Sequence, residues 1–158
     1  MPGLQSSEFR IEKQRSDAVI ILANGASVAG HFFLAQASPT STGRERVGEL
    51  LNGESGFFPF EDEDGDTVLY NRDHVVTVEV FDEEARRDAG YGVARERRVS
   101  LSLSNGQQLR GTVRVYRPEG RDRLSDWARH APRFRYLETT YSTFLVNVDH
   151  IVDAREET

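Results

Sequence analysis

The chain has 158 residues, no cysteine and a net charge of −6, and 37% of its residues are hydrophobic. The lack of cysteine excludes disulfides, thiolate metal ligands and a cysteine nucleophile. No apolar run approaches the ~18 to 20 residues of a membrane-spanning helix, and the first residues lack the pattern of a signal peptide, so we expect a cytoplasmic protein without a membrane partner.

The first predicted strands form a hairpin. Residues 1–16 are mostly polar and predict an N-terminal arm. A strand from Ala18 to Ala23 follows, then an Asn24-Gly25 turn and a return strand from Ser27 to Leu34. We expect a type I′ turn, because Asn-Gly tolerates the positive φ angles that this turn needs.

A short helix and three more strands are predicted next. Val47, Leu50 and Leu51 have the spacing of one apolar helix face. The expected strands are residues 57–61, one ending at Tyr70 and one beginning at Val75. Residues 82–97 are charged, contain two glycines and are expected to form a linker.

The same order of features then occurs a second time. The segment VSLSLSNGQQLRG (99–111) has the form of AVIILANGASVAG (18–30). Two further pairs of blocks match in the same order, namely 43–47 with 120–124 and 69–76 with 145–152. Ordered matches of this kind indicate an internal duplication. We therefore predict a first repeat over 17–81 and a second over 98–158.

Each repeat is predicted to contain five short strands, with a helix between its second and third strands. In the second repeat Leu124, Trp127 and Ala128 form the apolar face of that helix. Its later strands are expected at 134–138, up to Val146 and from Ile151. Five short, bent strands favour a small barrel, because closure removes the exposed edges of a sheet.

This order of motifs resembles the Sm-like (LSm) family. The matching features are the apolar strand with Asn24-Gly25 or Asn105-Gly106, and the late turn that ends in His74 or His150 before two β-branched residues. The segments 123–126 and 145–152 are also similar to a family of small bacterial domains without an assigned activity. The resemblance implies two tandem Sm-like five-stranded barrels, and it implies RNA binding less strongly, because Asp73 and Asp149 precede the histidines and would repel phosphate.

The best candidate binding residues are those of the two Asn-x-Asp-His turns. They are Asn71, Asp73, His74, Asn147, Asp149 and His150. One interpretation is a small polar pocket that reads a base edge or a partner's backbone. The other is that Asn and Asp stabilise their own turn while His begins a strand.

An arginine-rich stretch provides a second candidate surface. Between Arg95 and Arg135 there are eleven arginines and four acidic residues, in a chain that is acidic as a whole. Arg110, Arg114 and Arg117 are the candidate RNA contacts. The alternative is a solvated face whose arginines form ion pairs.

No catalytic motif, cofactor motif or metal spacing is found in the sequence. The acidic run at 61–66 lacks the glutamate that a calcium loop needs, and the four histidines have no paired metal spacing. We therefore expect no enzyme activity, no cofactor and no metal. The predicted function is a non-catalytic Sm-like assembly or protein-interaction module that forms a homo-oligomer or binds another protein. The alternative is an RNA-binding Sm-like protein that uses the arginine-rich second repeat.

Overall fold

The computed structural model describes residues 13–38, 43–116, 120, 123–129 and 132–157. Within these residues the chain is mainly β with a few short helices, which confirms that part of the prediction. The strands are β1 (Lys13–Leu22), β2 (Ser27–Ala35), β3 (Phe57–Asp62), β4 (Thr67–Asn71), β5 (Val75–Val80), β6 (Arg95–Leu103), β7 (Gln108–Val115), β8 (Phe134–Glu138), β9 (Thr143–Asn147) and β10 (Ile151–Glu156). The helices are α2 (Val47–Gly53) and α3 (Leu124–Arg129), with 3-10 turns η1 (Arg72–His74), η2 (Glu84–Arg87) and η3 (Val148–His150).

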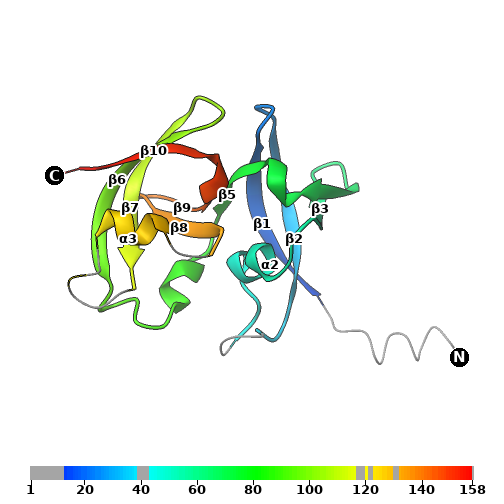
Figure 1. The fold of residues 1–158 in the computed structure, drawn as a ribbon. Helices are drawn as coiled ribbons and strands as arrows, with labels where there is room; N and C mark the ends of the chain where they lie inside the picture. The colour runs from blue at the N-terminus through cyan, green and yellow to red at the C-terminus, as the bar shows by residue number, and fades with distance from the viewer. Residues whose placement is uncertain (1–12, 39–42, 117–119, 121–122, 130–131, 158) are drawn as a thin grey trace, which may run out of the picture.

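The strands form one open antiparallel sheet in the order β10-β6-β7-β8-β9-β5-β1-β2-β3-β4. The first half of the chain, with strands β1 to β5, occupies one end of the sheet, and the second half, with β6 to β10, occupies the other (Figure 1). The internal order of strands is the same in both halves. The halves meet where β9 pairs with β5, and β4 and β10 are the two outer strands.

Register allows residues of the two halves to be matched. Phe57 pairs with Asn71 in β3 and β4, and Phe134 pairs with Asn147 in β8 and β9. We call residues at such equivalent positions counterparts. The register shifts by one residue at Val76, the second residue of β5, and it shifts in the same way at Val152, the second residue of β10.

Each half begins with a hairpin whose turn contains the Asn-Gly pair. Gly25 has a φ of 89° and Gly106 a φ of 87°, whereas no described residue other than glycine has a positive φ. The prediction of a type I′ turn is therefore wrong, since that turn also needs a positive φ at the asparagine. The loop is one residue longer: Leu22 N–H donates to the carbonyl of Ala26 at 2.9 Å, and Asn24 Oδ1 accepts from Ala26 N–H at 2.9 Å.

The glycine that ends each repeated motif lies where the sheet bends between neighbouring strands. β2 pairs with β3 over two residue pairs, and β7 pairs with β8 over one. A Cβ on Gly30 would lie 2.0 Å from the carbonyl oxygen of Glu61, and one on Gly111 would lie 2.5 Å from that of Glu138. Only glycine permits these close backbone approaches.

The helices add side chains to the hydrophobic clusters, as their spacing predicts. Val47 and Leu51 of α2 and Trp127 of α3 are buried, whereas Ala128, which the spacing placed on the same apolar face of α3, is exposed. The end of α2 is capped by Arg72 of η1, whose guanidinium donates to the carbonyls of Leu51 at 3.0 Å and Leu50 at 2.9 Å. Arg72 thus satisfies carbonyls that a helix end leaves without partners.

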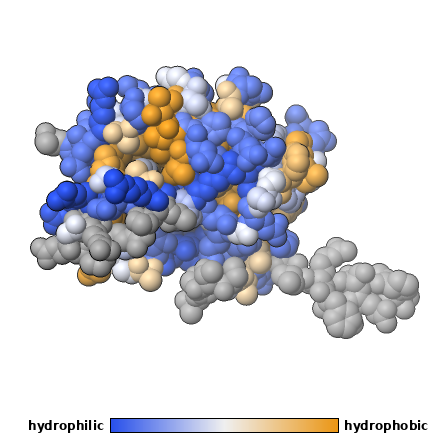
Figure 2. Space-filling model, viewed as in Figure 1, coloured by the Kyte–Doolittle hydropathy of each residue, from blue (hydrophilic) through white to orange (hydrophobic). Residues whose placement is uncertain are grey.

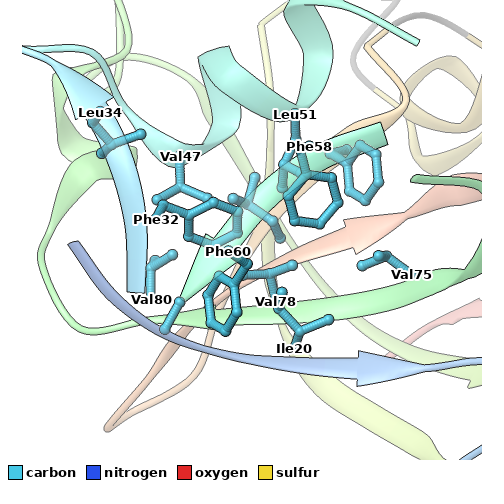
Figure 3. Close-up of a cluster of buried hydrophobic side chains, with 13 residues drawn as sticks. Ile20, Phe32, Leu34, Val47, Leu51, Phe58, Phe60, Val75, Val78 and Val80 are labelled. Carbon is cyan, nitrogen blue, oxygen red and sulfur yellow. The ribbon is translucent and has the colours of Figure 1, made fainter. Parts of the chain in front are cut away.

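The described residues form two hydrophobic cores, and each contains side chains from the other half of the chain. The first core surrounds Phe32, Phe58 and Phe60 (Figure 3) and includes Phe134 and Leu145 from the second half. The second core surrounds Leu101 and Trp127 and includes Val76 from the first half. The contact between β5 and β9 is therefore part of the hydrophobic interior.

The surface seen in Figure 2 is largely hydrophilic, with separate hydrophobic patches. Large hydrophobic side chains that are exposed within the described residues are Phe57, Leu69, Phe81, Val93, Tyr116, Tyr141 and Val152. Leu69 and Val152 lie on the outer strands, and Phe57 lies on the strand next to one of them. Among the described helices, none is long and apolar enough to span a membrane.

Candidate functional site

The two Asn-x-Asp-His turns lie against each other where the halves of the sheet meet. One turn comprises Asn71 and η1, and the other comprises Asn147 and η3. His150 Nε2 lies 2.7 Å from the backbone oxygen of Asp73, a residue 77 positions earlier in the chain. The structure thus brings together candidate residues from both halves.

Both asparagines stabilise their own turns. Asn71 Oδ1 accepts a hydrogen bond from Asp73 N–H at 2.9 Å, and Asn147 Oδ1 accepts one from Asp149 N–H at 3.0 Å. This is the local side-chain-to-backbone bond that makes Asn common in turns.

Asn147 also links the two halves. Its side chain is fully buried, and its Nδ2 donates to the carbonyls of Val75 at 2.8 Å and Arg72 at 3.3 Å. The Nδ2 of its counterpart, Asn71, makes no hydrogen bond within the described part of the chain. One amide is used across the joint, and the equivalent amide at the end of the outer strand β4 has no partner among the described residues.

The two histidines differ in the same way. His150 Nε2 donates to the carbonyl of Asp73, and His150 Nδ1 lies 2.6 Å from Ser104 Oγ. His74 is exposed, and its imidazole has no hydrogen-bond partner in the described residues. The first residue after β1, Ala23, has the place of Ser104 after β6, because Ala23 N–H donates to the carbonyl of His74 and Ser104 N–H donates to that of His150, both at 2.8 Å. His74 therefore has no hydroxyl in the position that Ser104 gives to His150.

Arg133 bridges the two aspartates. Its Nη2 lies 2.8 Å from Asp73 Oδ1, and its Nε lies 3.0 Å from Asp149 Oδ2. The carboxylates are 66% and 64% exposed, so each ion pair contributes little, about 0 to 1 kcal/mol. Arg133 also lessens the negative charge that would repel a phosphate. Within the described residues no group of three or more acidic or histidine side chains could hold a metal ion.

The candidate arginines lie elsewhere. Arg114 forms ion pairs with Glu96 at 2.8 Å and Glu138 at 3.2 Å, and its guanidinium lies 3.7 Å from the ring centroid of Tyr91. Arg110 is exposed on β7, and Arg117 lies outside the described residues. Arg114 therefore matches the ion-paired alternative, because its charge is already balanced.

A cavity of about 590 Å³ forms a second candidate site. It lies between α2, the segment after η2, β7, β8 and α3, so both halves contribute to its walls. One wall is held by Tyr136, whose hydroxyl donates to Glu84 Oε1 at 2.8 Å. Glu84 also accepts the N–H groups of Val47 and Gly48 at the start of α2, both at 3.1 Å. Burial raises the pKa of the Glu84 carboxyl above its ordinary value.

Opposite charges are balanced along another wall of the cavity. Arg46 Nη1 lies 2.5 Å from Asp88 Oδ1, and Arg46 Nε lies 3.1 Å from Glu49 Oε1. Burial alone would lower the pKa of Arg46, but these hydrogen bonds, together with the electrostatic attraction of Tyr136 and Asp88, outweigh burial and raise it. Arg46 therefore remains charged.

Arg133, Glu84 and the cavity were not found from the sequence. Arg133 has Gly56 as its counterpart, so comparison of the repeats gives no signal for it. Glu84 lies in a charged segment that was predicted as a linker, although it is 2% exposed. A single charged residue among many does not show which side chain the fold buries.

Comparisons with known proteins provide no relative for this chain. No family model matches it, and no curated protein or solved structure matches it significantly.

Proposed function

We propose that the chain is a non-catalytic assembly module with an Sm-like fold, and that its copies join head to tail through the outer strands β4 and β10. The observation that carries this proposal is the pairing of β9 with β5 inside the chain. β4 is the counterpart of β9, and β10 is the counterpart of β5. A joint between two copies would therefore repeat the joint within one copy.

The hydrogen-bond register of the inner joint supplies a template for the outer one. Inside the chain Leu145 faces Val78, and Thr143 faces Val80. In the proposed joint Leu69 of one copy faces Ala154 of the next. The unpaired backbone groups of an outer strand are available for such pairing.

Exposed hydrophobic side chains support the proposal, because their counterparts are buried at the inner joint. Phe57 is 60% exposed and Leu69 is 63% exposed, whereas their counterparts Phe134 and Leu145 are both 0% exposed. On the other outer strand Val152 is 69% exposed, and its counterpart Val76 is 0% exposed. Burial of such side chains against a second copy would stabilise it by about 25 cal/mol per Å² of apolar surface.

Charge and hydrogen bonding also favour a second copy as the partner. At the inner joint Ser142 Oγ donates to Glu79 Oε2 at 2.7 Å. The counterparts of these two residues are Asp66 and Arg155, which are exposed and oppositely charged. The free Nδ2 of Asn71 has the same place in its turn as the Nδ2 of Asn147, which donates across the inner joint.

RNA binding by Arg110, Arg114 and Arg117 stays a second prediction. The ion pairs of Arg114 make RNA binding the weaker of the two proposals, because an arginine whose charge is already balanced by two carboxylates gains less free energy from contact with a phosphate.

Sedimentation of the full chain over a range of concentrations tests the proposal. We expect a mass that rises to a multiple of one chain. The single reversals Asp66→Arg and Arg155→Asp should each weaken the assembly, because they place like charges together. The double variant should restore it, since each joint pairs residue 66 of one copy with residue 155 of another.

A matched control is Glu63→Arg, which reverses an exposed charge on the same β3–β4 turn. It should leave the assembly largely unchanged. A wild-type mass of one chain at every concentration would refute the proposal. If the chain also binds single-stranded RNA with an affinity that falls steeply with salt, the alternative function gains support.

A further inference from the structure

The cavity between the two halves has the size and the lining of a small-molecule site. Its volume of about 590 Å³ lies within the range of ligand pockets. Aromatic side chains from four parts of the chain line it, including Tyr116 of the segment after β7, Trp127 of α3, and Phe134 of β8. These side chains suit a flat, ring-containing ligand.

Two of the three arginines that line the cavity are balanced by carboxylates. Arg46 binds Asp88 and Glu49, and Arg114 binds Glu138 and a further glutamate. These pairs fix the shape of the walls but leave no net positive charge for a ligand.

Arg135 is the exception. It is 8% exposed, its Nε donates to the carbonyl of Pro132 at 2.6 Å, and its Cζ lies 5.0 Å from the ring centroid of Trp127. Within the described residues its two Nη groups have no hydrogen-bond acceptor, and no carboxylate lies within ion-pair distance. Arg135 is largely removed from water and has no counter-ion among the described residues, so its guanidinium is suited to an anion that enters the cavity.

The fold does not require an arginine at this position. Arg135 faces Val146 across β8 and β9, and its counterpart Phe58 faces Tyr70 across β3 and β4. Phe58 is 1% exposed and belongs to the first hydrophobic core. The second half therefore contains a buried charge where the first half contains a hydrophobic side chain.

We propose that this cavity binds a small oxyanion joined to a planar ring, with the carboxylate or phosphate on the guanidinium of Arg135 and the ring beside Trp127. A guanidinium can donate two parallel hydrogen bonds to either head group. The site is independent of the proposed assembly, since no residue of β4 or β10 lines the cavity.

Fluorescence of Trp127 tests this proposal directly, because it is the only tryptophan of the chain. The full chain is titrated with benzoate and with AMP, which carry the two possible head groups, and calorimetry provides a second readout. The neutral analogues benzamide and adenosine are titrated in parallel. We expect one of the two anions to bind saturably and its neutral analogue to bind about tenfold to hundredfold more weakly.

Two variants separate the guanidinium from the general charge of the protein. Arg135→Met keeps an unbranched side chain without the charge and should weaken anion binding by about tenfold to hundredfold. Arg98→Met removes an exposed arginine of β6 outside the cavity and should leave binding unchanged. Equal binding of the anion and its neutral analogue would overturn the proposal even if Arg135→Met fails to fold. Absence of binding by both anions at millimolar concentration would also overturn it.

Discussion

Replacement of Asn147 by alanine should destabilise the protein strongly. Its side chain makes hydrogen bonds with Val75 O at 2.8 Å, Asp149 N–H at 3.0 Å, and both Arg72 O and Arg133 Nε at 3.3 Å. Asn147 itself has no solvent exposure; its bonds to Val75 and Arg72 are buried, and those to Asp149 and Arg133 are partly buried. At a net value of about 0.5 to 1.5 kcal/mol for each bond, with the longer two at the low end, we expect a loss of about 2 to 4 kcal/mol.

The counterpart Asn71 provides the matched control. Its side chain makes one hydrogen bond, to Asp73 N–H, in an exposed turn. Asn71→Ala should therefore cost only about 0.5 to 1 kcal/mol. Urea unfolding at low protein concentration, where copies do not associate, compares the two variants. Equal losses of unfolding free energy would refute the view that Asn147 links the halves.

Two further predictions concern Gly111 and the buried Glu84. Gly111→Ala should cost about 1 to 3 kcal/mol of unfolding free energy, because the new Cβ would lie 2.5 Å from the carbonyl of Glu138. Gly53→Ala is its control, since nothing lies within 4 Å of that Cβ, and it should stabilise by about 0.5 to 1 kcal/mol. Glu84→Gln should change the pH dependence of stability. Because the pKa of Glu84 is raised above 4.5, the wild-type protein binds this proton more tightly when folded, and its stability relative to the variant should fall as pH rises above 4.5. Thermal unfolding at several pH values measures this difference, and a difference that stays constant or grows with pH would contradict the assignment.

The strands, the short helices and the hairpins could be predicted from local sequence. Alternating apolar residues identify strands such as β6, and the Asn-Gly pairs mark the turns. The prediction of the turn type was wrong because an Asn-Gly pair also suits the three-residue loop that the chain adopts. There Asn24 accepts a hydrogen bond from Ala26, and Gly25 alone has a positive φ.

Burial could not be predicted in the same way. Phe57 and Phe134 are both phenylalanines at equivalent positions, yet Phe57 is 60% exposed and Phe134 is 0% exposed. The difference comes from the next strand along the sheet: β9 is followed by β5, whereas β4 is the last strand and has a neighbour only on the side of β3. No local pattern in a strand encodes which strand will pair with it.

The candidate turns could be identified from the sequence, but their contact with each other could not. Their Asn-x-Asp-His pattern fits a turn that stabilises itself, and Asn71 and Asn147 each do so. The bond from His150 to Asp73 depends on the pairing of β5 with β9, which joins segments far apart in sequence. Arg133 bridges both turns for the same reason.

The exchange of side chains between the two cores makes the halves depend on each other for stability. Phe134 and Leu145 complete the first core, and Val76 completes the second. If either half opened, the other would lose part of its own interior and one side of the β5–β9 pairing. Heating should therefore melt both halves in a single cooperative transition, although the chain contains two sets of strands with the same order.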